Sequence, residues 1–437
     1  MNVTVLGAGC VGLVASAGLA DFGLNVTSAD IDAGKIKLLT GGQLPFYEPQ
    51  LAELVQRNMQ VGRLRFSTDI GAAVSDSQAI FIAVGTDAGP GGVPDLRYVW
   101  AAADTIAQSM NGYNVIVVKS TVPVGTWAEL HKRIASRLKS PAEFDVVSNP
   151  EFLREGSAVE DFFHPNRVVI GTNSERAAAV MRDVYRPLYL IETPFVFTTW
   201  ESAELIKYAA NSFLALKVSF VNELANLCDA IGPSADIHVV AKALGLDRRI
   251  GPKFLHPGPG FGGYCFPKDT RALCQIARQH GVEIKTIEAA VAVNDAQFLH
   301  VVAKVRNGLG GLKGKVVAVL GLSFKPNTDD VRESRSIAIC KAMLEDGAAI
   351  RAYDPVAAEQ SARVLSDDRL TYCKDSYQAA EASDALVVAT EWNEFRNVDL
   401  GRMKSLMRGD LLIDARNIYD SGKAKAAGFR YRGVGRQ

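Results

Sequence analysis

The sequence lacks a long apolar run and an excess of charge of either sign, and these two absences exclude some classes of function. Its 437 residues include 48 Lys plus Arg and 48 Asp plus Glu, so bulk charge does not indicate a nucleic-acid partner. No apolar run approaches the ~18 residues that a membrane span needs, and the chain does not open on a basic segment followed by an apolar stretch. We expect a cytoplasmic protein with neither a nucleic-acid nor a membrane partner.

Cysteine is also scarce, and its spacing argues against two kinds of small structural module. The cysteines show no paired spacing, which argues against a disulfide framework and against a zinc site. We therefore predict reduced thiols and no bound metal. The six are Cys10, Cys228, Cys265, Cys274, Cys340 and Cys373.

Residues 1–30 carry the most readable pattern that is present. A short apolar strand runs into the turn "GAGCVG", a helical stretch follows, and a second strand ends at Asp30. Gly7, Gly9 and Gly12 occupy the glycine places of the G-x-G-x-x-G motif, where the backbone turns tightly and approaches a pyrophosphate at a helix N-terminus. The Asp30 carboxylate would accept bonds from the ribose hydroxyls and repel a 2′-phosphate. We therefore predict that the cofactor is NAD, not NADP.

More apolar strands follow at the spacing of an α/β fold, with helical stretches between them, up to about residue 195. The pattern predicts a doubly wound parallel sheet, and we assign residues 1–198 to an N-terminal NAD-binding domain. Ligands of such sheets bind beyond the carboxyl ends of the strands. The residues directly after these strands are therefore candidates for the site: Thr86, Thr121, Glu151 and Glu155.

From Trp200 the pattern changes to one uninterrupted helix. No glycine occurs until Gly232, and apolar residues recur at helical spacing, so we predict a helix of about 30 residues, longer than is common. Glu204, Lys207 and Asn211 fall on one polar face of it. We expect this helix to join two domains and to pack against a second subunit. It opens a predicted central helical domain, residues 199–310.

The segment 311–437 echoes the first strand, turn, helix and strand, with Asp354 in the place of Asp30. Its first turn, "GLSFKPNTDD", lacks the second and third glycines of the motif. We therefore expect this C-terminal, Rossmann-like domain to hold no dinucleotide. Lys325 in this turn suits a nucleotide-bearing substrate or a structural role.

The stretch "GFGGYCFPKD" places a thiol, an amine and a carboxylate close together after a run of glycines: Cys265, Lys268 and Asp269. A single cysteine is more often a small buried hydrophobic residue than a nucleophile. Asp269 has an alternative role as the N-cap of the helix that follows. The stretch alone does not decide between these interpretations.

Six motifs in order, across essentially the whole chain, resemble those of the nucleotide-sugar 6-dehydrogenases, the UDP-glucose/GDP-mannose dehydrogenase family. They are "GAGCVGL", "KSTVPVGT", "NPEFLREG", "KYAANSFLALKVSFVNE", "GFGGYCFPKD" and "GLSFKPNTDDVRES". The resemblance implies two Rossmann-like domains joined by a long central helix. It also implies oxidation of the C6 alcohol of UDP-glucose to the carboxylate of UDP-glucuronate, with two NAD reduced in turn.

The resemblance assigns chemical roles to six residues. Cys265 is the nucleophile that converts an aldehyde into a thiohemiacetal and then a thioester, and Asp269 helps to activate the hydrolytic water. Lys207 and Asn211 hold the oxyanion of the tetrahedral species, and a nearby ammonium favours the thiolate form of Cys265. Thr121 and Glu151 position water or carry protons.

The remaining family positions carry over as contacts with the two ligands. The resemblance expects NAD to contact, besides the motif glycines, Val11, Asp30, Lys35, Thr86, Thr121, Glu155, Lys268 and Arg332. It expects the substrate to contact Glu151, Phe152, Leu153, Arg154, Lys207, Asn211, Phe254, Leu255, His256, Pro257, Gly258, Gly262 and Lys325. Arg249 matches an arginine that reaches the substrate across a homodimer interface. Tyr264 and Asp87 depart from the family pattern, and neither removes a chemical group from the mechanism.

Three alternatives stay open at this point. The first is the same chemistry on GDP-mannose or a UDP-N-acetylhexosamine. The second is a two-electron 3-hydroxyacid dehydrogenase, which needs no cysteine and lacks the C-terminal α/β domain. The third is a non-catalytic NAD sensor, against which the presence of Cys265, Lys207, Asn211 and Asp269 together argues.

Overall fold

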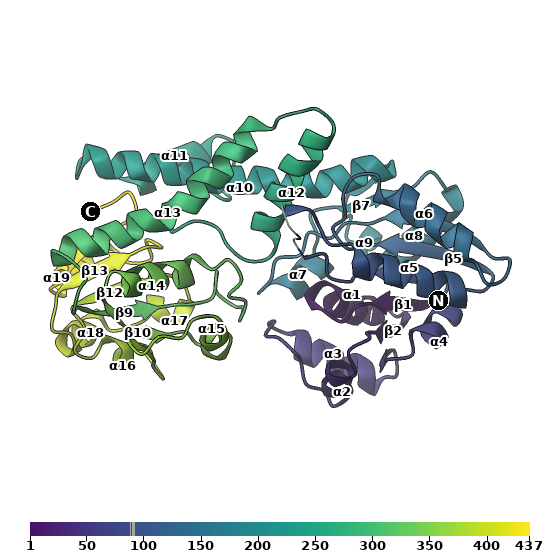
Figure 1. The fold of residues 1–437 in the computed structure, drawn as a ribbon, viewed down its shortest axis with the longest axis horizontal. Coiled ribbons are helices and arrows are strands. Elements are labelled where there is room, and N and C mark those ends of the chain that lie inside the picture. Colours follow the sequence, from purple (N-terminus) through teal and green to yellow (C-terminus); the bar gives the residue numbers. More distant parts are fainter. Residues whose placement is uncertain (88, 90–91) are drawn as a thin grey trace. The chain divides into compact units, whose positions relative to one another are not determined.

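The computed structural model describes residues 1–87, 89 and 92–437, and the chain divides into two compact units. Unit 1 comprises residues 1–210 with 278–280, and unit 2 comprises residues 211–277 with 281–437. Each unit contains one mainly parallel sheet covered by helices, and one long helix joins them, so the predicted fold class is confirmed (Figure 1). The three domain boundaries set from the sequence stay a prediction.

The sheet of unit 1 has the strand order β3-β2-β1-β4-β5-β6-β7-β8. Its first six strands have the order of a doubly wound dinucleotide-binding fold, which places a ligand crevice beside β1 and β4. The strands are β1 (Asn2–Leu6), β2 (Asn25–Ala29), β3 (Leu64–Ser67), β4 (Ala79–Ile82), β5 (Tyr113–Val118), β6 (Glu143–Ser148), β7 (Val168–Gly171) and β8 (Phe195–Thr198).

The parallel run ends at β6, because β7 pairs with β6 in the antiparallel direction. Residues that follow β7 therefore lie at the opposite edge of the sheet from those that follow β4, β5 and β6. The sequence predicted one parallel sheet throughout, since strand direction is not encoded in an apolar run. The predicted site residues that follow strands of this unit come after β1, β2, β4, β5 or β6, which are parallel, so the departure leaves their common edge intact.

Helices cover both faces of this sheet, and strand residues alternate between two cores. Phe81 and Val117 pack with α1, α3, α7 and α8, whereas Ile80 and Ile116 pack with α4, α5 and α6. This alternation follows from the two-residue period of a strand, and burial on both faces explains why the strands read as continuous apolar runs. The helices are α1 (Cys10–Asp21), α2 (Ala33–Thr40), α3 (Leu51–Gln60), α4 (Ile70–Ser75), α5 (Arg97–Ser109), α6 (Thr126–Arg137), α7 (Ala158–Phe163), α8 (Glu175–Val184) and α9 (Arg186–Leu190).

The predicted long helix is α10 (Trp200–Ile231), of 32 residues, and it runs from unit 1 into unit 2. Its buried face consists largely of small and polar residues, with Glu204, Lys207 and Asn211 among them. Bulky apolar residues such as Phe213 and Phe220 are exposed instead, at 61% and 49%. The periodicity thus identifies the helix correctly, but its bulky apolar stripe is not the face that the chain covers.

Unit 2 contains a six-stranded sheet in which every pair is parallel, with the order β11-β10-β9-β12-β13-β14. This order matches the first six strands of unit 1, so the repeat predicted from the sequence is present in the fold. The strands are β9 (Val316–Leu320), β10 (Ala349–Tyr353), β11 (Leu370–Tyr372), β12 (Ala385–Val388), β13 (Leu411–Asp414) and β14 (Arg430–Gly433).

One face of this second sheet packs on α10, α13 and α14, and the other on α16 to α19 (Figure 1). Between α10 and the sheet strands the chain forms α11, then an irregular stretch, then α12, whose first residue is Cys265. The helices are α11 (Ile237–Leu246), α12 (Cys265–Gln279), α13 (Lys285–Leu309), α14 (Arg335–Glu345), α15 (Ala358–Val364), α16 (Ser376–Ala380), α17 (Asn393–Arg396), α18 (Leu400–Leu406) and α19 (Ser421–Ala426).

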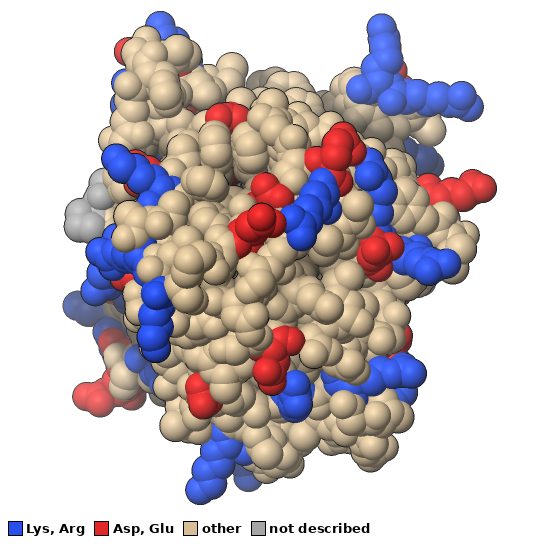
Figure 2. Space-filling view, turned by 90° about the vertical axis from the view of Figure 1, so that its right-hand side faces the viewer, with Lys and Arg blue, Asp and Glu red and all other residues tan. Residues whose placement is uncertain are grey.

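The surface carries charges of both signs, and the described helices are not suited to span a membrane. Figure 2 shows one side of the molecule, on which Lys and Arg residues alternate with Asp and Glu residues, in keeping with a formal net charge of zero. Among the residues that the structure describes, no helix combines the length and apolar character needed to cross a bilayer. Nor do the same residues contain a group of three or more His, Cys, Asp or Glu side chains placed to hold a metal ion.

Candidate active site

The glycine turn after β1 has the close packing that a dinucleotide-binding turn requires. Gly7 has φ +98°, and a Cβ there would lie 2.6 Å from Ala83 O. A Cβ at Gly12 would lie 1.8 Å from Gly7 O, so only glycine allows the turn to close onto α1. A Cβ at Gly9 would meet nothing within 4 Å, which leaves open space over the turn where a pyrophosphate can approach.

The N-terminus of α1 suits an anion. In this helix, all of which the structure describes, no side chain caps the first turn and no acidic residue lies in it. Its positive dipole end is therefore directed at whatever lies over the glycine turn. Val11 is the second residue of this helix, where the sequence analysis expects a cofactor contact.

Asp30 directly follows β2, and its carboxylate accepts several hydrogen bonds. Its Oδ2 accepts Ala8 N–H at 2.8 Å and Lys35 Nζ at 2.9 Å, and its Oδ1 accepts Asp32 N–H. Burial alone would raise the pKa of Asp30, but these hydrogen bonds and the Lys35 charge outweigh burial and lower it. The turn, the helix end and the carboxylate together fit a bound NAD.

The equivalent carboxylate of unit 2, Asp354, is occupied by the protein itself. Its Oδ2 accepts bonds from Leu322 N–H, Ser323 N–H and Trp392 Nε1, and its Oδ1 accepts Val356 N–H and Ala357 N–H. The side chain is 2% exposed, against 9% for Asp30, and with both oxygens bonded by the protein it is less open to a ribose. This arrangement agrees with the expectation that the second glycine turn holds no dinucleotide.

Two of the predicted cofactor residues lie at the carboxyl edge of the first sheet. Thr86 is buried after β4, and Thr121 is half-buried after β5. Ser120 Oγ donates to Val84 O at 2.7 Å and thereby ties these two turns together. Glu155, in the segment after β6, is half-buried as well.

Glu204 of α10 holds the turn that carries Thr121. Its carboxylate accepts Gly125 N–H at 2.7 Å and Trp127 N–H at 3.2 Å, at the start of α6. Burial raises the pKa of Glu204 to about 8. The polar face of α10 that the sequence indicated therefore includes a residue that fixes a backbone turn, beside the predicted oxyanion-binding residue Lys207.

Lys207 and Glu151 form a buried ion pair within unit 1. Lys207 Nζ lies 2.8 Å from Glu151 Oε1, with side-chain exposures of 3% and 5%. Glu151 Oε2 also accepts Leu153 N–H at 2.5 Å, which curls the chain after β6 around the carboxylate. Burial would raise the pKa of Glu151, but the Lys207 charge in particular holds it below its usual value. Glu151 is thus kept as an anion beside a cation.

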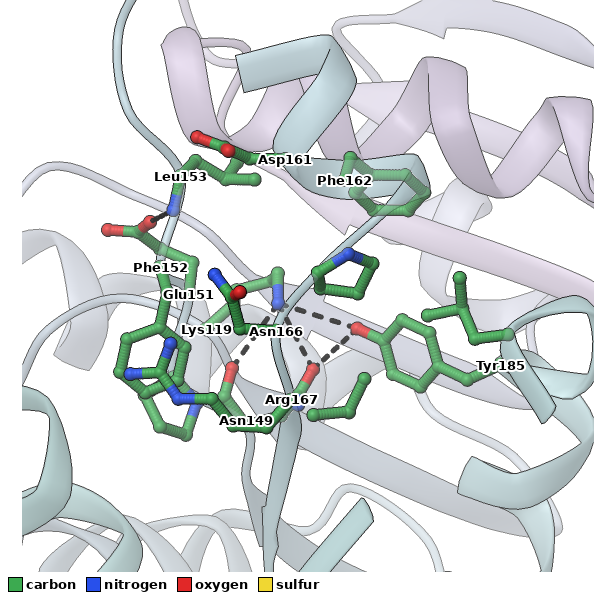
Figure 3. Close-up of a pocket in the computed structure, with 14 residues that line it drawn as sticks. Lys119, Asn149, Glu151, Phe152, Leu153, Asp161, Phe162, Asn166, Arg167 and Tyr185 are labelled. Carbon is green, nitrogen blue, oxygen red and sulfur yellow. Dashed lines mark hydrogen bonds between the residues drawn. The ribbon is translucent and has the colours of Figure 1, made fainter. Parts of the chain in front are cut away.

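A second buried cation, Lys119, lies in a pocket that Glu151 also lines (Figure 3). Its Nζ lies 3.2 Å from Asn149 Oδ1 and 3.4 Å from Tyr185 Oη, both neutral partners. Burial lowers the pKa of Lys119 to about 8. The sequence analysis missed Lys119, although it directly follows the apolar strand β5, the rule that selected Thr121.

Two arginines make side-chain contacts that hold the segment after Glu151 in place. The Arg167 guanidinium lies 3.3 Å above the centre of the Phe152 ring (Figure 3). Arg154 pairs with Asp161 at 2.6 Å. The run at residues 151–154 that is expected to contact the substrate is therefore held from several directions.

In unit 2, Cys265 is the first residue of α12, at the positive end of the helix dipole. Asp269 lies inside this helix, so its alternative role as an N-cap is wrong. Its Oδ2 accepts Asn211 Nδ2 at 2.6 Å and its Oδ1 accepts Lys268 Nζ at 2.7 Å. The structure therefore brings three of the residues predicted from two distant motifs into one buried cluster.

Tyr264, the departure from the family pattern, lies between two residues expected to contact NAD. Lys268 Nζ lies 5.3 Å from the centre of the Tyr264 ring, and Arg332 Cζ lies 4.4 Å from it. Cations near an aromatic face are attracted by the ring quadrupole. Tyr264 thus orients both cations.

The other predicted substrate residues lie in irregular segments of unit 2. Phe254 adopts φ +64°, a left-handed conformation that is uncommon without glycine, and Leu255, Pro257 and Gly258 are buried, whereas His256 is exposed. A Cβ at Gly262 would lie 2.4 Å from Glu333 O. Lys325 is half-buried in the turn after β9.

Arg249 pairs with Asp247 and is 89% exposed in its side chain. Within this single chain the structure does not test a role for it at the site of a partner subunit.

Family models match this chain in three consecutive segments. They are described as the NAD binding domain, the central domain and the UDP binding domain of the UDP-glucose/GDP-mannose dehydrogenase family. The matched residues are 1–189, 201–296 and 318–421.

Relatives match over the full length. The chain is 50% identical to UDP-glucose 6-dehydrogenase of Rhizobium meliloti (strain 1021), with all of both chains covered. It is 46% identical to UDP-glucose 6-dehydrogenase TuaD of Bacillus subtilis (strain 168), covering all of this chain and 93% of that one. A solved UDP-glucose dehydrogenase from the hyperthermophilic archaeon Pyrobaculum islandicum superposes with a TM-score of 0.92 at 40% identity, covering 100% of this chain and 98% of that one.

Proposed function

The chain belongs to the UDP-glucose/GDP-mannose dehydrogenase family, and from this premise we propose that it oxidises UDP-glucose to UDP-glucuronate with NAD. Each turnover consumes one UDP-glucose, two NAD and one water, and yields UDP-glucuronate, two NADH and three protons. The observation that carries the cysteine-dependent part is the placement of Cys265 as the first residue of α12, with Asp269 one turn further on.

Unit 1 supplies the redox half of the reaction. NAD, when bound, accepts the hydride that leaves C6. Gly7, Gly9 and Gly12 form the turn for its pyrophosphate, and Asp30 accepts its ribose hydroxyls. Thr86, Thr121 and Glu155 lie at the same edge of the sheet, since they follow β4, β5 and β6.

Unit 2 supplies the covalent half. The first oxidation converts the C6 alcohol into an aldehyde. The C6 carbon of the aldehyde is trigonal and carries no hydroxyl oxygen that could drive the loss of a second hydride. The Cys265 thiolate adds to this carbon and gives a thiohemiacetal. Loss of its hydroxyl proton and of a hydride, for which a second bound NAD would be the acceptor, converts it into a thioester. Water then attacks the thioester, the C–S bond breaks, and the thiolate returns. Asp269, held by Asn211 and Lys268, assists the attack of water.

Lys207 and Asn211 stabilise the oxyanion of the tetrahedral species. They lie one turn apart on α10, so their polar ends project from the same side of the helix. Lys207 donates to Glu151, and an ammonium group carries three hydrogen-bond donors. Glu151 balances the Lys207 charge before the oxyanion forms.

We propose a homodimer assembled through α10 and α11. Phe213, Phe220 and Leu227 recur every seven residues on α10 and are exposed at 61%, 49% and 55%. On α11, Val239 and Leu246 are exposed at 64% and 75%. A stripe of this kind suits a second copy, and Arg249 would then reach the partner's substrate. Sedimentation tests this: Phe213→Asp with Phe220→Asp should give monomers, and an active parent monomer would contradict the assignment.

The same chemistry on GDP-mannose or a UDP-N-acetylhexosamine is the alternative within the family. The names of the relatives favour UDP-glucose for this chain. The 3-hydroxyacid dehydrogenase alternative is not supported, because the family match extends to a UDP binding domain at residues 318–421.

A substrate panel read by NADH absorbance tests the proposal. We expect UDP-glucose to be turned over best, with two NADH formed for each acid produced. Cys265→Ser should remove acid formation, while the matched variant Cys274→Ala, which deletes a buried thiol from the same helix, should retain it. If Cys265→Ser made the acid at the parent rate, the covalent mechanism would be wrong; if GDP-mannose were the best substrate, only the substrate assignment would be wrong.

A further inference from the structure

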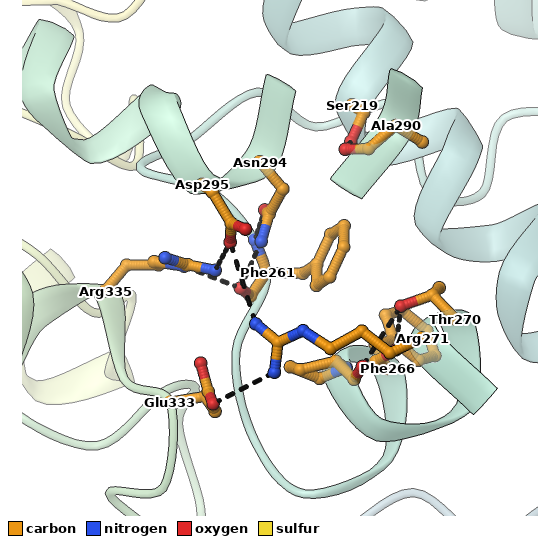
Figure 4. Close-up of polar contacts among 11 residues, drawn as sticks. Ser219, Phe261, Phe266, Thr270, Arg271, Ala290, Asn294, Asp295, Glu333 and Arg335 are labelled. Carbon is orange, nitrogen blue, oxygen red and sulfur yellow. Dashed lines mark hydrogen bonds and ion pairs between the residues drawn. The ribbon is translucent and has the colours of Figure 1, made fainter. Parts of the chain in front are cut away.

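The peptide of Phe261, four residues before Cys265, is held by the side chain of Asn294 on α13. Phe261 N–H donates to Asn294 Oδ1 at 2.6 Å, and Asn294 Nδ2 donates to Phe261 O at 3.1 Å (Figure 4). The Asn294 side chain is 1% exposed. A buried amide that pairs with both polar groups of one residue fixes the position and orientation of that residue.

Arg335, the first residue of α14, holds the same carbonyl from another direction. Its Nε donates to Phe261 O at 3.0 Å, and its Nη2 donates to Asp295 Oδ1 at 2.9 Å (Figure 4). Arg335 is 8% exposed. Side chains from two successive helices, α13 and α14, therefore bond one peptide of the cysteine loop, the segment 260–264 that leads into α12.

The network also reaches the helix that Cys265 begins. Arg271 of α12 pairs with Glu333 at 3.2 Å and lies 3.9 Å from Asp295. Glu333 belongs to the turn that leads into α14, as does Arg332, whose carbonyl accepts Gly263 N–H at 2.9 Å. The cysteine loop, α12, α13 and the turn before α14 are thus joined by polar contacts.

Two glycines of the loop pack closely against this frame. Gly260 has φ +109°, and a Cβ there would lie 2.7 Å from Asn294 Oδ1. Gly263 has φ +80°, and a Cβ there would lie 2.6 Å from the Phe324 ring. The glycines of the loop therefore allow the close approach that the hydrogen bonds to Phe261 require.

We propose that Asn294 and Arg335 are positioning residues for the Cys265 nucleophile, which they place by holding the peptide of Phe261. They fix the backbone that delivers Cys265 to the start of α12, and a nucleophile displaced by about 1 Å can lose roughly 100-fold in rate. The inference rests on the proposed role of Cys265 in catalysis.

Asn294→Ala tests this, because it removes both bonds to Phe261. We expect kcat for UDP-glucose oxidation to fall by about 10- to 100-fold. The KM for NAD should change much less than kcat, because the glycine turn of unit 1 is untouched. Alkylation of Cys265 by iodoacetamide, followed by peptide mass spectrometry, should become severalfold faster relative to Cys10, since a loosened loop exposes a half-buried thiol.

Two further variants separate positioning from general stability. Ser219→Ala removes a buried hydrogen bond from Ser219 Oγ on α10 to Ala290 O on α13, which does not involve Phe261 (Figure 4). This variant should leave kcat and the alkylation ratio unchanged. Arg335→Lys keeps the charge but cannot bond both Phe261 O and Asp295 as Arg335 does, and should repeat the effect of Asn294→Ala in milder form.

An alkylation ratio and kcat equal to those of Ser219→Ala, in both Asn294→Ala and Arg335→Lys, would overturn the inference. If Asn294→Ala does not fold, Arg335→Lys decides in the same way. Alkylation needs no turnover, so it reports the placement of the loop even if the proposed function fails. A changed alkylation ratio with parent kcat would show that the loop moved without consequence and would also overturn the inference.

Discussion

Lys207 Nζ and Glu151 Oε1 lie 2.8 Å apart, and both side chains are almost completely buried. A buried pair of this kind contributes little to stability compared with an apolar pair, but loss of one partner is costly, because the other charge is left uncompensated. The pair is therefore better explained by chemistry than by folding. It keeps an ammonium desolvated and oriented where an oxyanion is expected to form.

Lys207→Met should lower kcat by about 100- to 1000-fold, the usual cost of one oxyanion donor, and should lower the melting temperature because Glu151 loses its partner. Steady-state kinetics and thermal unfolding measure the two effects. The double variant Lys207→Met with Glu151→Gln is the control: it should recover much of the stability and none of the activity. Recovery of both would contradict the role in catalysis.

Lys119 also acts on the Glu151 carboxylate, and its effect can be tested separately from that of Lys207. Three cations act on Glu151: Lys207 from α10, Lys119 from the end of β5 and Arg167 from the start of β7. Lys119→Met removes one of them, so the pKa of Glu151 should rise. Activity that needs the Glu151 anion should then be lost at a higher pH on acidification, which moves the acidic limb of the kcat profile upward.

Tyr185→Phe is the matched control for Lys119→Met, because it removes one hydrogen-bond partner of Lys119 and leaves the ammonium in place. Its acidic limb should stay near that of the parent. An acidic limb in Lys119→Met that coincides with the parent's would show that Lys119 has no electrostatic influence on the step that limits kcat.

Glu204 should make the stability of the protein depend on pH. Burial raises the pKa of Glu204 from 4.5 to about 8, so between these values the folded state holds a proton that the unfolded state has released. Stability from this group is therefore fully present below the unfolded pKa and is lost as pH rises through the folded pKa. Urea unfolding across this range should show a smaller decline in Glu204→Gln than in the parent; equal declines would contradict the assignment.

The sequence was sufficient for the parts of the site that local pattern encodes. The glycine turn, Asp30 and the residues after β4, β5 and β6 follow from strand and turn rules, because parallel strands end at one edge. The motifs also predicted Lys207, Asn211 and Asp269 together, and the structure shows the ion pair of the first and the cluster of the other two.

The parts that the sequence could not supply depend on packing between distant segments. Lys119 met the strand-end rule that selected Thr121, but only the packing of Asn149 and Tyr185 around it shows that it is buried. The antiparallel turn into β7 depends on how the chain crosses the sheet edge, and an apolar run does not specify it. Which face of α10 is buried also depends on tertiary contacts, and the bulky residues Phe213 and Phe220 lie on the exposed one.

Asp30 should decide between the two nicotinamide cofactors. Its carboxylate is ionised and pairs with Lys35, so it accepts ribose hydroxyls and repels a 2′-phosphate. Asp30→Ala should lower kcat/KM for NAD and raise it for NADP, since the released Lys35 can attract the phosphate. Asp32→Ala removes a neighbouring carboxylate that caps α2, and it should leave the cofactor ratio near the parent's. Equal efficiency of the parent with NAD and NADP would contradict this account of Asp30.

Asp269 connects the buried cluster of unit 2 to the last chemical step. Its two oxygens accept Lys268 Nζ and Asn211 Nδ2, and the side chain is 1% exposed, so it is held in one orientation beside the helix end that carries Cys265. Asp269→Asn keeps the shape and removes the negative charge. If Asp269 assists the attack of water on the thioester, this variant should still form the thioester and hydrolyse it slowly.

A covalent adduct should therefore accumulate on Cys265 when Asp269→Asn is mixed with UDP-glucose and NAD, and intact-protein mass spectrometry would detect it. A burst of about two NADH per active site should appear before turnover slows, because both hydride transfers precede hydrolysis. Lys268→Met is the control, since it removes the partner of Asp269 Oδ1 and keeps the carboxylate; it should alter the KM for NAD more than it slows hydrolysis. Loss of turnover in Asp269→Asn with neither burst nor adduct would place Asp269 before thioester formation and contradict its assignment to the hydrolytic step.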